Sequence, residues 1–167
     1  MSDRDGRPAL HPTRIDIPPE IRLYLTTLLN QTLACTVDLR SQAKQAAWNV
    51  KGKEGSQLQV LFERIAAELD AYANLLADRL VVLGGVALGT ARTAARHSTL
   101  PEYPGDIAAG DAHALALAER VALYATAVRD AIARAADVGD ADTAAVYTDI
   151  SRGVDKRLQL LEAHLHQ

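Results

Sequence analysis

The stretch Lys44-Gln-Ala-Ala-Trp-Asn-Val-Lys-Gly52 closes a long helical pattern and fixes where the first element of the chain ends. Upstream of it, apolar residues recur three and four positions apart, which is the spacing of one helix face. Pro19 suits the first turn of such a helix, and Gly52 suits the chain just beyond its end. The pattern predicts a helix over residues 20–48 with an apolar face of Ile21, Leu25, Leu28, Leu29, Leu33, Val37 and Leu39.

A second long helix is predicted to follow. Ser56 and Gln59 match the capping box, in which two side chains satisfy the free backbone N–H groups at a helix start. The pair Gly84-Gly85 predicts that this helix ends in left-handed backbone. Its expected apolar face consists of Leu58, Phe62, Ile65, Leu69, Tyr72, Leu76 and Leu80.

The second half of the chain predicts two more long helices after an irregular crossover. Residues 90–97 can form a short helix, and Pro101 and Pro104 impose a loop. Asp111 opens a third pattern, which ends near Val138-Gly139, and Asp140 caps a fourth. The expected apolar residues are Leu115, Val121, Tyr124, Val128 and Ile132 in the third helix, and Val146, Ile150, Val154, Leu161 and Leu165 in the fourth. Four long helices with one long connection predict an all-α, ferritin-like four-helix bundle with a short helix in the crossover.

The composition is consistent with this fold. A chain of 167 residues with 49% hydrophobic residues buries a substantial core without disulfides. The net charge of −3 argues against a surface dedicated to nucleic acid. Cys35 is the only cysteine, so no intrachain disulfide can form and a reducing cytoplasm is expected. No window is long and apolar enough to span a bilayer, so we expect no membrane association.

Prolines divide the chain into two parts. Residues 1–18 are polar and contain Pro8, Pro12 and Pro18, which is typical of an extended tail. Residues 19–167 form the predicted helical domain.

Four phrases of the sequence carry a family resemblance. They are the opening stretch, Leu83-Gly-Gly-Val-Ala-Leu-Gly-Thr90, Leu100-Pro-Glu-Tyr-Pro-Gly-Asp106 and Ser151-Arg-Gly-Val-Asp-Lys156. Together they make residues 11–166 resemble the Dps family, the dodecameric mini-ferritins of stressed bacteria. The resemblance implies a homo-oligomeric hollow dodecamer. Iron also follows from the resemblance alone, and the residues themselves assign no cofactor.

The ligands that the resemblance implies are largely missing. The family's iron centre lies between two subunits related by a twofold axis. The family His at the end of the first helix falls on Ala47, and the early pair of the second helix falls on Gln59 and Glu63. The late pair falls on Asn74 and Asp78. Only Glu63 and Asp78 keep a carboxylate, and Trp48 is the aromatic residue beside the site.

Ligand chemistry indicates what this loss means. Iron(II) needs several anionic or imidazole ligands at once, and alanine offers none while asparagine and glutamine are weak neutral donors. We expect ferroxidation to be absent or severely weakened. Glu63 and Asp78 are then residual metal positions, a polar patch at the dimer interface or solvated helix charges. Gln59 also has the simpler interpretation of a capping-box residue.

Two further family features are altered. The family's fourth helix opens with Asp-Thr-Ala-Asp, whose second aspartate lines a threefold pore; here the run is Asp142-Thr-Ala-Ala145. A carboxylate ring favours a cation in a narrow pore, so Ala145 weakens this route unless Asp140, Asp142 and Asp149 compensate. Tryptophans that the family often carries near the C-terminus are replaced by Arg157 and Gln159.

These features favour a shell-forming Dps-like protein of the stress-protection and iron-sequestration family that has lost its ferroxidase centre. It would act as a non-catalytic cage or assemble with an active relative. One alternative is an active iron-storing ferroxidase that uses the remaining carboxylates, so the sequence does not decide whether the chain is an enzyme. A second is a nucleoid-associated protein that protects DNA, although the tail balances Arg4, Arg7 and Arg14 with Asp3, Asp5 and Asp16.

Overall fold

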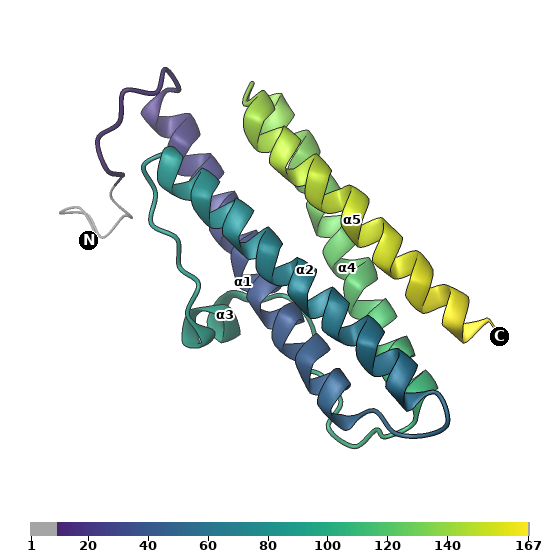
Figure 1. Cartoon of the computed structure of the whole chain (residues 1–167). Helices are drawn as coiled ribbons and strands as arrows, with labels where there is room; N and C mark the ends of the chain where they lie inside the picture. Colours follow the sequence, from purple (N-terminus) through teal and green to yellow (C-terminus); the bar gives the residue numbers. More distant parts are fainter. Residues whose placement is uncertain (1–9, 167) are drawn as a thin grey trace.

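The computed structural model describes residues 10–166 and places four long helices in two antiparallel hairpins (Figure 1). The elements are α1 (Pro19–Asn49), α2 (Gly55–Val82), α3 (Ala91–His97), α4 (Gly110–Asp137) and α5 (Ala141–Leu165). Helix α1 packs mainly on α2, and α4 packs mainly on α5. The segment from α2 to α4 contains α3 and runs the length of the bundle. The predicted all-α bundle with a short crossover helix is confirmed.

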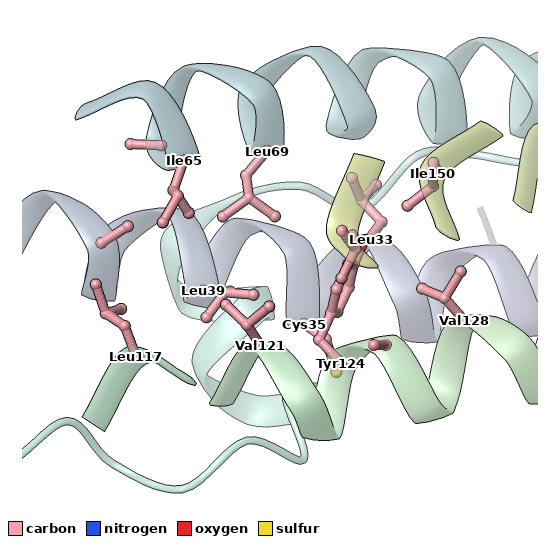
Figure 2. Packing of buried hydrophobic residues seen from close by; sticks show 14 of the residues in the cluster. Leu33, Cys35, Leu39, Ile65, Leu69, Leu117, Val121, Tyr124, Val128 and Ile150 are labelled. Atoms are coloured by element: carbon pink, nitrogen blue, oxygen red, sulfur yellow. The ribbon is translucent and has the colours of Figure 1, made fainter. Parts of the chain in front are cut away.

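The core lies where the two hairpins meet. Figure 2 shows side chains from α1, α2, α4 and α5 pointing into one cluster around Leu39 and Val121. Cys35 belongs to this cluster and is buried. Burial of this much apolar surface is the main force that holds the hairpins together.

Two buried tyrosines place hydroxyl groups inside this core. The Tyr124 hydroxyl lies 2.7 Å from Thr36 Oγ1, and the Tyr147 hydroxyl lies 3.0 Å from Thr32 Oγ1. Both threonine hydroxyls donate to backbone carbonyls of α1, so the tyrosines donate to the threonines. Burial raises the pKa of both tyrosines, although the threonine contacts lower it. These bonds satisfy polar groups whose burial would otherwise be costly.

The helix ends confirm two sequence predictions. Gly84 has φ 84°, and the N–H groups of Gly84 and Gly85 bond to Val81 O and Leu80 O. This is the Schellman pattern, which requires left-handed backbone at the first glycine. Gly139 ends α4 in the same way, with φ 82°.

The predicted capping box at Ser56 and Gln59 is wrong. Helix α2 begins at Gly55, its N-cap is Glu54, and no side chain caps it. The turn at Gly52, where φ is 108°, lets Gly55 N–H bond to Gly52 O, and Leu58 N–H then bonds to Glu54 O. Backbone bonds therefore start the helix before Ser56, and Gln59 is an exposed residue of its surface.

The predicted core position of Leu115 is also wrong, because its side chain is 51% exposed. Leu117 is buried instead, together with Ala114 and Ala118. Two residues correspond to about 200° around a helix, so Leu115 and Leu117 cannot face the same side. Small alanines complete the buried face of α4 where a leucine was expected.

The crossover is held by side chains from the long helices. Asn30 bonds to both Val86 O and the Leu88 N–H, and Gln31 donates to His97 O. Further along, Gln42 donates to Pro101 O and Arg120 donates to Glu102 O. A segment without regular structure needs such partners for its backbone groups.

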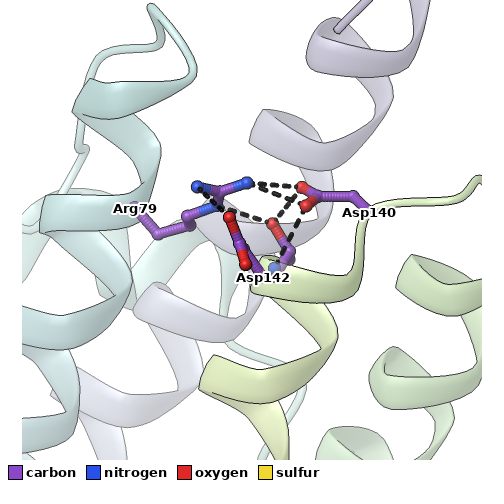
Figure 3. Close-up of polar contacts among 4 residues, drawn as sticks. Arg79, Asp140 and Asp142 are labelled. Atoms are coloured by element: carbon purple, nitrogen blue, oxygen red, sulfur yellow. Dashed lines mark hydrogen bonds and ion pairs between the residues drawn. The ribbon is translucent and has the colours of Figure 1, made fainter. Parts of the chain in front are cut away.

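The end of α2 is joined to the start of α5 by a buried ion pair (Figure 3). Arg79 Nη2 lies 2.8 Å from both carboxylate oxygens of Asp140, and Arg79 Nε donates to Thr143 Oγ1 at 2.9 Å. Asp140 also caps α5 by accepting the Thr143 N–H, as the sequence predicts. The more exposed Asp142 lies 3.9 Å from Arg79.

Replacing Gly153 with alanine is expected to destabilise the bundle. A Cβ at this position would overlap the Tyr72 hydroxyl and lie 3.0 Å from Tyr72 Cζ. Alanine favours a helix by about 1 kcal/mol over glycine, but overpacking costs about 1 to 3 kcal/mol, so the sum should be unfavourable. Urea unfolding at fixed protein concentration would show a lower midpoint. Gly105→Ala is the control, because nothing lies within 4 Å of its Cβ position. An unchanged or higher midpoint for Gly153→Ala would contradict the packing described.

Replacing Asp140 with asparagine separates its charge from its capping role, because asparagine caps equally well. Because it removes one partner of a buried pair, Asp140→Asn should lower the free energy of unfolding by about 3 kcal/mol at pH 7. Asp155→Asn, at the exposed Arg129–Asp155 pair, should lower it by less than about 1 kcal/mol. Urea unfolding of both variants measures the difference.

The same comparison has a defined pH dependence. Burial raises the pKa of Asp140, but bonds from Arg79 and Thr143 outweigh it and leave this pKa below its usual value. The ionised Asp140 carboxylate therefore stabilises the folded protein fully above about pH 4, and this stabilisation is lost as the pH falls through the pKa of Asp140 in the folded state. The gap between wild type and Asp140→Asn should therefore shrink below pH 4, and a constant gap would show that the charge contributes nothing.

Candidate functional site

The five positions that the sequence singles out lie on α1 and α2. Ala47 is in the last turn of α1 and is 3% exposed, so only a buried methyl group stands at this position. Gln59, Asn74 and Asp78 are exposed on α2. Glu63 is half-buried.

The Glu63 carboxylate already has a cationic partner. Lys44 Nζ lies 2.7 Å from Glu63 Oε2, and the same ammonium lies 5.8 Å from the centre of the Trp48 ring. Trp48 itself is 70% exposed. A partly exposed ion pair adds little to stability, but it neutralises the carboxylate and places a positive charge beside it.

Within one protomer the two remaining carboxylates cannot act together. Glu63 and Asp78 are 15 residues apart on one helix, which corresponds to about 22 Å along its axis. Asn74 and Asp78 are one turn apart and share a face, but asparagine carries no charge. Across residues 10–166, no three side chains of His, Cys, Asp or Glu are grouped so that they could hold a metal ion.

Two of the predicted pore residues lie at an open depression of about 520 Å³ beside the turn between α4 and α5. Ala145 and Asp149 line it, and Arg152 lies there as well, 3.6 Å from the Asp149 carboxylate. Asp140, which pairs with Arg79, and Asp142 do not line the depression. The negative charge available there is therefore partly balanced.

Sequence reasoning missed the role of Arg157. Its guanidinium forms two bonds to the Glu68 carboxylate, one of them 2.7 Å long from Nε, across the gap between α5 and α2. The bond from Arg157 lowers the pKa of Glu68 despite burial. Burial and the Glu68 charge raise the pKa of Tyr72 to about 12. Glu68 and Arg157 each stand three or four positions from apolar core residues of their own helix, and this spacing is the signal that could have indicated a partly buried pair.

The histidines occupy separate places. His113 is buried in α4, and its Nδ1 lies 2.7 Å from the Tyr103 hydroxyl; burial lowers the pKa of His113. His97 ends α3. His164 Nε2 lies 3.4 Å from carboxylate oxygens of Glu54 and Asp111, while His166 is exposed. Residues two positions apart on a helix point to different faces, so His164 and His166 do not converge on one site.

None of the helices within residues 10–166 combines the length and the apolar character that crossing a membrane requires.

Comparison with known proteins identifies the fold and the family. A model of the ferritin-like domain matches residues 26–167. The DNA protection during starvation protein of Agrobacterium fabrum is 36% identical over 157 residues, which cover 94% of this chain and 97% of that protein.

Solved structures agree with this match. DpsC from Streptomyces coelicolor superposes with a TM-score of 0.89 at 28% identity, over 94% of this chain and 92% of that one. Dps from Microbacterium arborescens, in its high-iron form, superposes with a TM-score of 0.83 at 26% identity, over 95% of this chain and all of that one. The helical bundle, the four sequence phrases and these matches together show that the chain belongs to the Dps family of ferritin-like proteins.

Proposed function

We propose that this protein forms a cytoplasmic Dps-type cage, a dodecamer, whose inter-subunit ferroxidase centre is inactive. It acts as a non-catalytic shell or assembles with an active relative. The observation that carries the proposal is the state of the five ligand positions. Ala47 is a buried methyl group, Gln59 and Asn74 are neutral amides, Glu63 is bound by Lys44, and Asp78 is an exposed carboxylate.

Ligand chemistry supports this proposal. Two subunits brought together at these positions supply two carboxylates per site and no imidazole, and one of the carboxylates is already neutralised. The Lys44 ammonium would repel an iron(II) ion at the distance where Glu63 would bind it. Iron(II) needs several anionic or imidazole ligands, so the residues present do not fit a ferroxidase centre.

The pore positions support the same conclusion. Ala145 adds no carboxylate, and Arg152 places a guanidinium 3.6 Å from Asp149. A pore attracts cations when one sign of charge is concentrated along it. Mixed charge in this depression predicts a weak route for iron into the cage.

The alternatives remain distinct hypotheses. An active ferroxidase would have to use Glu63, Asp78 and other carboxylates at a rebuilt or relocated centre. A nucleoid-associated, DNA-protecting protein would depend on basic residues of the tail, part of which lies outside the described residues. The net charge of −3 and the balanced charges of the tail favour neither non-specific attraction to DNA nor strong salt dependence.

Restoring the ligands tests the central proposal. The wild type should oxidise iron(II) with oxygen or peroxide no faster than the protein-free solution. A variant with Ala47→His, Gln59→His, Glu63→Asp, Asn74→Asp and Asp78→Glu rebuilds the implied family set and should gain a saturable rate. Absorbance of the iron(III) product measures both.

The control for this experiment is Gln57→His, which adds an imidazole to an exposed position of the same helix outside the set. It should leave the rate at the protein-free level. Saturable oxidation by the wild type that falls on Glu63→Ala would show instead that the remaining carboxylates form a working centre.

Mixing tests the hetero-assembly part of the proposal. Subunits of this protein and of an active Dps relative, dissociated together and reassembled, should give hybrid shells because the fold is retained over nearly the whole chain. Native mass spectrometry resolves the hybrids by mass. Strict self-sorting into two pure populations would show that the two chains do not share an assembly.

A further inference from the structure

The crossover between α3 and α4 is anchored by one aromatic side chain. Among residues 98–109, only Tyr103 is buried, with 3% of its surface exposed. Other bonds to this segment reach its backbone, and one of them is donated by the Lys51 N–H to Ala108 O at 3.1 Å. The attachment of the segment through its own side chains therefore depends mainly on Tyr103.

The partner of Tyr103 is a buried histidine. The Tyr103 hydroxyl lies 2.7 Å from His113 Nδ1, and the two rings are stacked with their centres 6.0 Å apart. His113 is 1% exposed. The hydroxyl makes no other hydrogen bond within residues 10–166, so its proton is donated to Nδ1. The imidazole is then neutral and carries its own proton on Nε2.

The surroundings of His113 favour this neutral form. Its Nε2 is buried and makes no hydrogen bond of normal geometry in the described part of the chain. Burial lowers the pKa of His113, and the backbone of Ile107 offsets only part of this effect. The Arg120 guanidinium, a permanent cation, lies 5.5 Å from the centre of the Tyr103 ring. A second positive charge on His113 would therefore be unfavourable.

No carboxylate would compensate a charge on His113. Between Leu10 and His166, the histidine–carboxylate contacts within 4 Å both belong to His164, which lies beside Glu54 and Asp111.

The remaining charged groups around the pair are engaged elsewhere. Glu102 of the crossover accepts the N–H of Tyr103, and Glu119 of α4 lies 3.6 Å from Arg120. Helix α1 contributes the neutral amide of Gln42 to this segment, and α2 contributes the apolar Leu58 beside Gly110. An imidazolium at position 113 would be a buried cation without an anion.

We propose that the Tyr103–His113 pair is a pH-sensitive contact, which holds the crossover on the bundle while His113 is neutral and releases residues 98–109 when His113 takes a proton. Protonated Nδ1 becomes a donor, so the Tyr103 hydroxyl loses its acceptor. Separation of the crossover from α4 admits water to both rings and removes this conflict. The inference goes beyond the proposed function, because it involves neither iron nor the family ligand positions.

The direction of the pH dependence follows from the lowered pKa. A histidine exposed to water titrates near pH 6.5, and the pKa of His113 in the closed state is lower. The closed state is therefore fully favoured above about pH 6.5 and loses stability as the pH falls from there towards the pKa of His113 in the closed state. His113 is the only buried histidine within residues 10–166, so this opening should be local.

Hydrogen exchange measured by mass spectrometry, between about pH 7.5 and about pH 5, tests the proposal. After correction for the intrinsic effect of pH, two amides report opening: Lys51 N–H, bonded to Ala108 O, and His113 N–H, bonded to Ala109 O. Both should exchange at least about threefold faster at the acid end. Peptides from the middle of α4, residues 121–132, should show no change.

Two glutamine variants assign the effect to one histidine. His113→Gln keeps an acceptor for the Tyr103 hydroxyl but cannot take a proton, so exchange at Lys51 should no longer depend on pH. His164→Gln is the matched control, because it removes the other histidine at this end of the bundle, and it should keep the full response.

Tyr103→Phe gives a second test that does not require a change at His113. It keeps the ring but removes the bond that stabilises neutral imidazole, so the response should move to higher pH. A wild type without a pH response, a response that survives in His113→Gln or disappears in His164→Gln, or an unshifted response in Tyr103→Phe would each overturn the inference. None of these results depends on iron oxidation, so the proposed function is decided separately.

Discussion

Helix α2 is apolar on two sides, and a helix of this kind needs a partner on each. One side, with Phe62, Leu69 and Leu76, is buried in the bundle core. The opposite side carries the exposed apolar residues Val60, Ala67, Ala71, Leu75 and Val82. The bundle therefore covers only one of the two apolar sides. The positions Gln59, Glu63, Asn74 and Asp78, to which the family resemblance assigns ligands, lie on the same helix, so whatever covers this face also determines their surroundings.

Charge neutralisation connects the fold to the proposed loss of ferroxidase activity. A ferroxidase centre gathers carboxylates that repel one another until a metal binds. In this chain three carboxylates of α2, those of Glu63, Glu68 and Asp70, are paired with basic side chains instead, and Lys44 lies 2.7 Å from Glu63. Arg157 does the same for Glu68, in a partly buried pair between α5 and α2. Basic side chains stabilise these carboxylates without metal, and they provide no redox chemistry.

The fold was accessible from the sequence because helix periodicity and helix ends are local properties. The glycines at 84 and 139 and the cap at Asp140 were read correctly for this reason. The prediction of a capping box was wrong because the turn at Gly52 starts α2 before Ser56. The prediction that Leu115 lies in the core was wrong because alanines form that part of the buried face of α4. The partners of Lys44, Glu68 and Arg157 depend on packing between helices, and periodicity does not specify which charges meet. The missing ligands were visible in the sequence, but the cation beside Glu63 was not.

The most direct test of the account is the position of iron in crystals soaked with iron(II), located by anomalous scattering at the iron edge. The account predicts no iron between Glu63 of one subunit and Asp78 of the next, with Lys44 still on Glu63. A well-occupied pair of iron ions bridging these two carboxylates, with the Lys44 ammonium displaced, would contradict it.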